Sequence, residues 1–114
     1  MQVQYQLNLV GTIILSDEKG RTILLNNPHW ETGEVESLLC SANGYNWARI
    51  ELPETLFPDL FTSIKTYHEE GEKGIGLRGY QQPHVLELKR KIESLEGSLV
   101  NILKTNNVKL EHYL

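Results

Sequence analysis

Residues 48–67, ARIELPETLFPDLFTSIKTY, contain the change of pattern that decides the fold. Up to Leu52 apolar and polar residues alternate, which is typical of a half-buried strand. Beyond Pro53 the apolar residues recur at intervals of three and four, which predicts an amphipathic helix. The apolar positions of this helix are Phe57, Leu60, Phe61, Ile64 and Tyr67. Strands before this point and helices after it predict an α+β fold.

The N-terminal residues predict an antiparallel sheet. In residues 2–9 the apolar positions, Val3, Tyr5, Leu7 and Leu9, alternate with Gln and Asn, so one face of this strand is apolar. We interpret residues 12–15 as a continuation of the same strand beyond a bend at Gly11.

A hairpin follows this first strand. The segment SDEKGR, residues 16–21, predicts a turn in which Gly20 adopts a positive φ. Residues 22–25 predict the return strand, which ends before Pro28. We expect a sheet of about four antiparallel strands, mainly a β meander, within residues 2–52.

Residues 28–45 are open to two interpretations. Asn43-Gly44 between two apolar runs is typical of a tight hairpin, with Ala48, Ile50 and Leu52 sharing a face of the second strand. Alternatively, Thr32 caps a short helix that Asn43-Gly44 ends. We favour the hairpin.

The C-terminal half predicts two helices joined by a glycine-rich connection. We expect a helix over residues 54–70, a connection over 71–82, and a second helix over 83–105 that begins at Pro83. A chain of 114 residues is long enough for one modest core, so we expect a single domain over 1–114.

The second helix carries a coiled-coil-like apolar seam. Its a and d positions are Val85, Leu88, Ile92, Leu95, Leu99 and Ile102. The seam can fold back on the chain or pair with its copy in a second chain. We favour the second outcome, a homodimer through the C-terminal helix, because a domain this small gains from burying a further apolar stripe. The order of residues 104–114 is left open.

The connection contains a G-x-G-x-x-G spacing at Gly74, Gly76 and Gly79. A dinucleotide site needs a strand before these glycines, whereas here a helix precedes them. We therefore interpret them as a turning loop and expect no cofactor. The loop residues that we expect to contact a partner are Lys73, Arg78 and Tyr80.

The sequence offers little sign of catalytic or metal chemistry. Cys40 is the single cysteine, and neither G-x-S-x-G nor His-Glu-x-x-His occurs. His84 and Glu87 have a spacing that could share a metal, but we interpret them as solvated. We expect no catalytic residues and no metal site, and the sequence favours a protein that is not an enzyme.

The remaining candidates concern binding. Trp30 and Trp47 lie near predicted turns, where Trp can anchor a partner. Lys89, Arg90 and Lys91 form a basic cluster, although the net charge of −4 opposes binding to nucleic acid. We expect a small cytoplasmic protein-binding module without membrane segments, an adaptor or an inhibitor, whose partner has a basic surface that complements the acidic sheet. The alternatives are a nucleic-acid-associated protein that uses the basic C-terminal third, and a small ligand-binding domain or enzyme.

Overall fold

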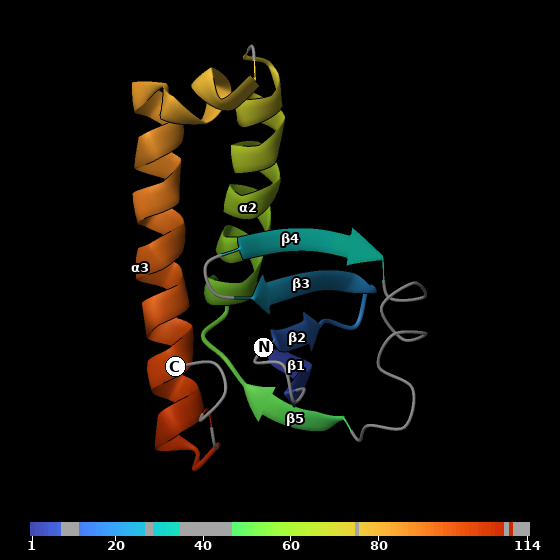
Figure 1. Ribbon diagram of the computed structural model, residues 1–114. Helices are drawn as coiled ribbons and strands as arrows, with labels where there is room; N and C mark the ends of the chain where they lie inside the picture. Colours follow the sequence, from blue (N-terminus) through green and yellow to red (C-terminus); the bar gives the residue numbers. More distant parts are fainter. Residues whose placement is uncertain (8–11, 27–28, 35–46, 75, 109, 111–114) are drawn as a thin grey trace.

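The computed structural model describes residues 1–7, 12–26, 29–34, 47–74, 76–108 and 110. An antiparallel sheet of five strands precedes two long helices (Figure 1), which confirms the α+β class. The strands are β1 (Gln2–Leu7), β2 (Thr12–Ser16), β3 (Arg21–Asn26), β4 (His29–Glu34) and β5 (Ala48–Glu51). The helices are α2 (Leu56–Glu72), the short 3₁₀ helix η1 (Gly76–Gln81) and α3 (Pro83–Thr105).

The strand order is β4-β3-β2-β1-β5, and all neighbours are antiparallel. The prediction of one bent strand over residues 2–15 is wrong, because β1 and β2 pair with each other, with Tyr5 opposite Leu15. The chain therefore reverses between Leu7 and Thr12. The predicted alternation of burial holds over Gln2, Val3 and Gln4, but it fails at Gln6, which is buried.

The segment around Trp30 is a strand rather than a turn. In β4, Trp30 lies opposite Leu25 and Thr32 lies opposite Ile23, so Thr32 does not cap a helix. The prediction of a strand at residues 48–52 is confirmed by β5, whose neighbour among the described strands is β1. Asn43-Gly44 and most of the predicted hairpin lie outside the described residues.

The core lies between one face of the sheet and the two helices. The register places Val3, Leu15 and Ile23 on this face, and α2 and α3 run antiparallel against it (Figure 1). The buried core side chains include Val3, Ile13, Leu15, Ile23, Leu25, Ile50, Phe57, Leu60, Ile64, Ile92, Leu99 and Leu103. β2 is buried on both faces along its whole length.

The helices begin and end close to the predicted positions. α3 has the predicted bounds, with Pro83 in its first turn. α2 continues through Gly71, which we expected to end it, and stops at Glu72. Both helices extend beyond the sheet to a distal end where η1 joins them (Figure 1). Among the described residues, no helix has the length and apolar character needed to cross a membrane.

Candidate functional site

The distal end of the helical pair is fixed by glycines that contact one another. We call residues 70–74 and 78–86 the tip. A Cβ at Gly79 would overlap the carbonyl oxygen of Gly71, and a Cβ at Gly74 would overlap the backbone of Gly79. A Cβ at Gly71 would overlap the ring of Tyr80. Gly74 and Gly79 therefore allow the backbone at the end of α2 to lie close to that of η1.

The three predicted loop residues differ in exposure. Lys73 and Arg78 are exposed, while Tyr80 is half-buried and its ring packs 5.2 Å from that of Tyr67. Nζ of Lys73 donates to Glu70 Oε1 at 3.0 Å. Within the described part of the chain, Arg78 forms no ion pair. Tyr80 therefore builds the tip, and Lys73 and Arg78 are displayed by it.

His84 does not pair with Glu87 as a metal-site interpretation would require. Its Nε2 lies 3.4 Å from Glu70 Oε2, and Glu70 also accepts from Lys73. These two contacts lower the pKa of Glu70 below its ordinary value, and the hydrogen bond from Lys73 makes the larger contribution. In the described ranges, no three His, Cys, Asp or Glu side chains are placed to hold a metal ion.

Trp30 belongs to an aromatic cluster that joins β4 to the helices. Its ring meets Tyr67 edge-on at 6.0 Å, and its carbonyl oxygen bonds Nε2 of His68. The indole N–H donates to Glu96 Oε2 at 2.6 Å. Trp30 is only 5% exposed, so it is packed into the junction and is not displayed to a partner.

Glu96 receives the indole hydrogen bond in a half-buried position. Burial raises the pKa of Glu96 above its ordinary value of 4.5, the Trp30 N–H opposes this shift, and the charge of Glu93 adds to it. Sequence reasoning missed this contact, because 66 residues separate Trp30 from Glu96. The other candidate aromatic residue, Trp47, is half-buried immediately before β5.

Most of the predicted dimer seam is used inside the chain, because Leu95 and Ile102 also pack against the core. Val85, Ile92 and Leu99 are buried where α3 runs beside α2. The d positions, Leu88, Leu95 and Ile102, are partly exposed. A coiled coil between two chains is thus not confirmed, and the three buried positions are not displayed for a partner.

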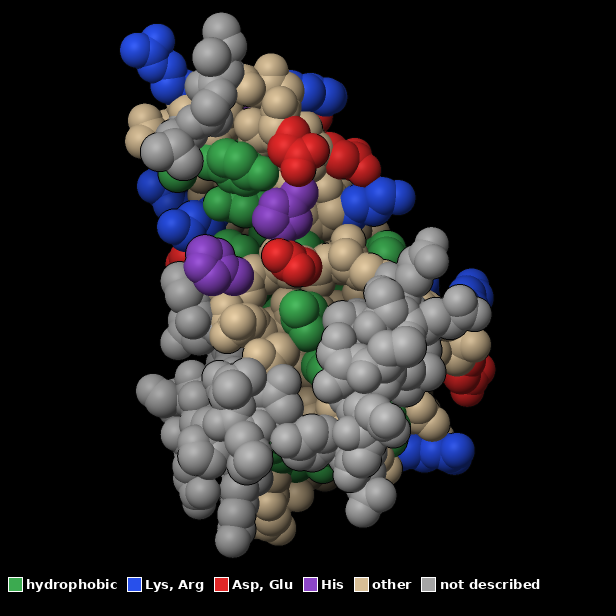
Figure 2. All heavy atoms as spheres, turned by 45° about the vertical axis from the view of Figure 1, so that its right-hand side comes forward, with side chains coloured by type: hydrophobic (Ala, Val, Ile, Leu, Met, Phe, Trp, Pro, Cys, Tyr) green, Lys and Arg blue, Asp and Glu red, His purple; other side chains and the backbone are tan. Residues whose placement is uncertain are grey.

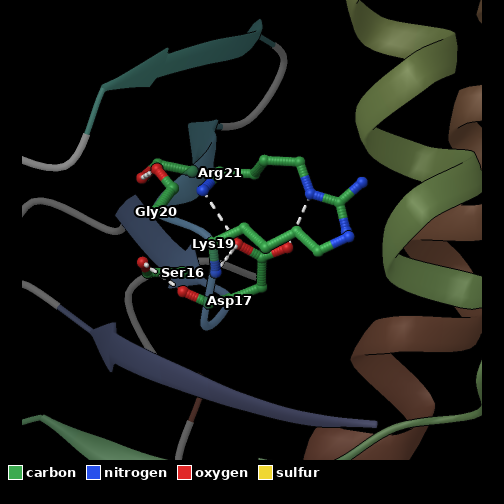
Figure 3. A network of polar contacts seen from close by, with 6 residues as sticks. Ser16, Asp17, Lys19, Gly20 and Arg21 are labelled. Atoms are coloured by element: carbon green, nitrogen blue, oxygen red, sulfur yellow. Dashed lines mark hydrogen bonds and ion pairs between the residues drawn. The ribbon is translucent and has the colours of Figure 1, made fainter.

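The turn between β2 and β3 is built around a buried carboxylate. Oδ1 of Asp17 accepts the backbone N–H groups of Lys19 and Arg21 at 3.1 and 2.8 Å. Its Oδ2 accepts Nε of Arg21 at 2.6 Å (Figure 3). The Arg21 guanidinium lies 5.8 Å from the rings of Phe57 and Phe61. Gly20 has a φ of 79°, as the turn prediction required. This carboxylate therefore links the turn to Arg21 and, through the Arg21 guanidinium, to the aromatic rings of α2.

An open polar groove lies beside this turn, on the sheet face that points away from the helices. It has a volume of about 530 Å³, and its lining includes Gln2, Gln4, Ser16, Glu18 and Arg49. Gln4 lies between Arg49 and Ser16 in the register. Sequence reasoning missed this groove, because the three strands that form its floor come together only through β-pairing.

Gln6 lies next to Gln4 along the same strand face but is only 2% exposed. Within the described residues, neither polar atom of its side-chain amide has a hydrogen-bond partner. A buried amide without a partner costs about 1–3 kcal/mol. Replacing this amide by an apolar side chain of the same shape is therefore expected to stabilise the sheet.

The basic cluster Lys89-Arg90-Lys91 is exposed along α3. On the face drawn in Figure 2, the described Lys and Arg side chains stand apart at the margins, with acidic and His side chains between them. That face has no continuous basic patch among its described residues.

Comparisons with protein families, curated proteins and solved structures find no match to this chain.

Proposed function

We propose that this protein is a small non-catalytic module that binds another protein, and that the tip is its contact surface. The observation that carries this proposal is the interlocked packing of Gly71, Gly74 and Gly79. It holds the end of the helical pair in one conformation, and a surface that is already ordered loses less conformational entropy when it binds.

The side chains displayed by the tip suit a protein partner. Arg78 and Lys73 are exposed, and so is the apolar side chain of Leu86, at 38%. In Figure 2 the upper part of the molecule gathers hydrophobic side chains beside charged and His side chains. A mixed surface of this kind, with Arg present, resembles protein–protein interfaces more than the uniformly basic surface of a nucleic-acid-binding protein.

The position of the tip also supports this function. It lies beyond the sheet (Figure 1), so a partner can approach it without displacing the core. The acidic side chains Glu69 and Glu72 are exposed close by. They disfavour phosphate backbones and favour a partner that presents both an acidic group for Arg78 and basic groups for the glutamates.

The test is site-specific photo-crosslinking. A photoreactive residue replaces Arg78 in one sample and Lys91 in a control sample, and both proteins are exposed to extract from the source cells. We expect a discrete protein adduct from position 78 and a weaker one from position 91, with nuclease treatment leaving the adduct intact. A K73A/R78A variant should lower capture of the same protein at least tenfold, because both cations of the tip are removed.

The matched control is K89A/K91A, which removes the same number of charges from the exposed face of α3. If both double variants capture the partner as well as the parent protein does, the tip is only a connector and this proposal fails. An adduct that nuclease removes would instead support the nucleic-acid alternative.

A further inference from the structure

Among the described residues, nothing covers the outer edge of β5, whereas α2 covers part of β4. On β4, the carbonyl oxygen of Trp30 forms a hydrogen bond with His68 of α2, and α2 lies against β4. The strand partner of β5 is β1 on its inner side, and no described helix runs along its outer side (Figure 1). An exposed strand edge is a template for pairing with another strand.

The register shows which backbone groups point outward from β5. Met1 and Leu52 exchange two backbone hydrogen bonds, both of 2.8 Å. Hydrogen-bonded and non-hydrogen-bonded residue pairs alternate along an antiparallel ladder. The backbone N–H and C=O groups of Ile50 therefore also point inward and bond to Val3. The N–H and C=O groups of Arg49 and Glu51 therefore point away from the sheet.

The side chains at this edge are complementary to themselves. Arg49 and Glu51 are exposed and share the sheet face opposite to the buried Ile50. We propose that a second copy of this chain pairs with β5, antiparallel, about a two-fold axis at Ile50. In this arrangement Arg49 lies opposite Glu51 of the partner subunit and Glu51 lies opposite Arg49 of the partner subunit. The two sheets then form one continuous sheet.

The charges and the backbone select this register over its neighbours. An axis at Arg49 places two arginines opposite each other, and like charges at opposed positions are destabilising. An axis at Glu51 opposes two glutamates and sets Arg49 against Pro53, which has no N–H to donate. In a register shifted by one residue, Arg49 would lie opposite Ile50 of the partner subunit. The backbone N–H and C=O groups of the partner's Ile50 point into its own sheet, so the outward groups of Arg49 would have no partner. Only the axis at Ile50 satisfies both the hydrogen bonds and the charges.

The side chains remain free to make these contacts. Within the described part of the chain Arg49 has no ion pair, and the Glu51 side chain is 67% exposed although one oxygen accepts the Met1 amine at 2.7 Å. The strand has only four residues, so we expect a reversible equilibrium between monomer and dimer that weakens as salt screens the charges.

The test is sedimentation velocity over a concentration series, with charge-swapped variants. R49E alone and E51R alone each place like charges opposite each other, so each should raise the dimer dissociation constant about tenfold or more. The double variant R49E/E51R restores both ion pairs with their signs exchanged. An equimolar mixture of the two single variants also restores both pairs, so it should dimerise although neither component does.

Two results would overturn the proposal. One is a parent chain that stays monomeric throughout the series. The other is single variants that dimerise as the parent does, because the contact would then lie elsewhere, for example along α3. Circular dichroism confirms that each variant is folded.

Hydrogen exchange on the unmodified chain keeps the proposal testable if a variant fails to fold. The amide protons of Arg49 and Glu51 should become protected as concentration rises, whereas that of Ile50 is protected at every concentration. Equal exchange of Arg49 and Glu51 at all concentrations would contradict the pairing. The β5 edge and the tip lie at opposite ends of the molecule, so this experiment and the crosslinking experiment fail independently.

Discussion

Glu96 lies where burial and a hydrogen bond act in opposite directions on one carboxyl group. Burial raises its pKa, the indole N–H of Trp30 lowers it, and the nearby charge of Glu93 raises it, with a net upward shift. A carboxyl whose pKa is higher in the folded than in the unfolded state binds its proton more tightly when the chain is folded. The contribution of Glu96 to stability is therefore lost as the pH rises from 4.5 through the raised pKa.

The variant E96Q should accordingly gain stability relative to the parent as the pH rises. Gln keeps an oxygen that accepts the Trp30 N–H but carries no charge to desolvate. We expect the difference in unfolding free energy between E96Q and the parent to favour the variant more at pH 7 than at pH 4. Denaturant unfolding at both values measures this, and the indole N–H resonance of Trp30 follows the titration directly.

The matched control is E70Q, because the pKa of Glu70 is shifted in the other direction. Glu70 stabilises the fold above its unfolded pKa, and this contribution is lost as the pH falls. E70Q should therefore lose stability relative to the parent at pH 7 and lose less at pH 4. If both variants change with pH in the same direction, the assignment of the two shifts is wrong.

Gln6 offers a second test at a single position. Met has nearly the same shape as Gln and no amide to leave without a partner, so Q6M should raise the unfolding free energy by about 1 kcal/mol. Thermal or denaturant unfolding measures this. Q4M is the control, because Gln4 is exposed on the same strand face, and its effect should stay within about 0.5 kcal/mol. A loss of stability in Q6M would mean that its amide is satisfied.

Among the secondary-structure elements, the glycines of η1 and α3 have opposite roles. Gly79 is required by the closeness of Gly71, whereas a Cβ at Gly97 would meet nothing within 4 Å. G97A should therefore stabilise α3 by about 0.5–1 kcal/mol, because Ala restricts the unfolded chain and favours the helix. G79A should destabilise the tip by about 1–3 kcal/mol through overpacking.

Urea unfolding of the two variants in parallel checks both signs. If G79A were as stable as the parent, α2 and η1 would not be in contact, and the ordered tip on which the proposed function rests would be lost with that contact.

The hairpin between β2 and β3 is another element fixed by one residue, since the Asp17 carboxylate binds both the turn and Arg21.

For the molecule as a whole, the question is what the apolar stripe of α3 covers. Ile92 is fully buried within the chain, so I92A should lower the unfolding free energy by about 3 kcal/mol. This loss should be the same across a hundredfold range of protein concentration. L88A, at a partly exposed position of the same stripe, should cost less than about 1 kcal/mol. A loss in I92A that grew with protein concentration would indicate that the stripe is an interface between chains.

Local sequence patterns were enough to predict most elements of this fold. The 3-4 spacing that begins near Phe57 and the position of Pro83 predicted two helices, because helical periodicity and proline geometry act over a few residues. The alternation around Val3 predicted a strand with one buried face. The same patterns failed between Leu7 and Thr12, where we expected a bent strand although β1 and β2 pair antiparallel, since a glycine in the sequence is compatible with either.

The tip was predicted only in part. Lys73 and Arg78 were identified as candidates and are exposed, while most of the expected glycine-rich connection forms the 3₁₀ helix η1. The packing of Tyr80 inside the tip was not predicted. The contact that a glycine allows depends on which residue the fold places opposite it. The Trp30–Glu96 hydrogen bond and the polar groove beside Arg49 could not be found in this way, since each joins residues from distant parts of the sequence.

The amino-acid sequence by itself therefore determined the α+β class, the bounds of α3 and the apolar faces, because these depend on periodicity and on the backbone preferences of single residues. The tertiary structure alone decided that β5 joins β1, that most of the apolar seam of α3 packs within the chain, and that Trp30 is enclosed rather than displayed. Strand pairing and helix packing bring together residues that local patterns cannot relate. The surfaces left for partners follow from which of these contacts the fold has already used.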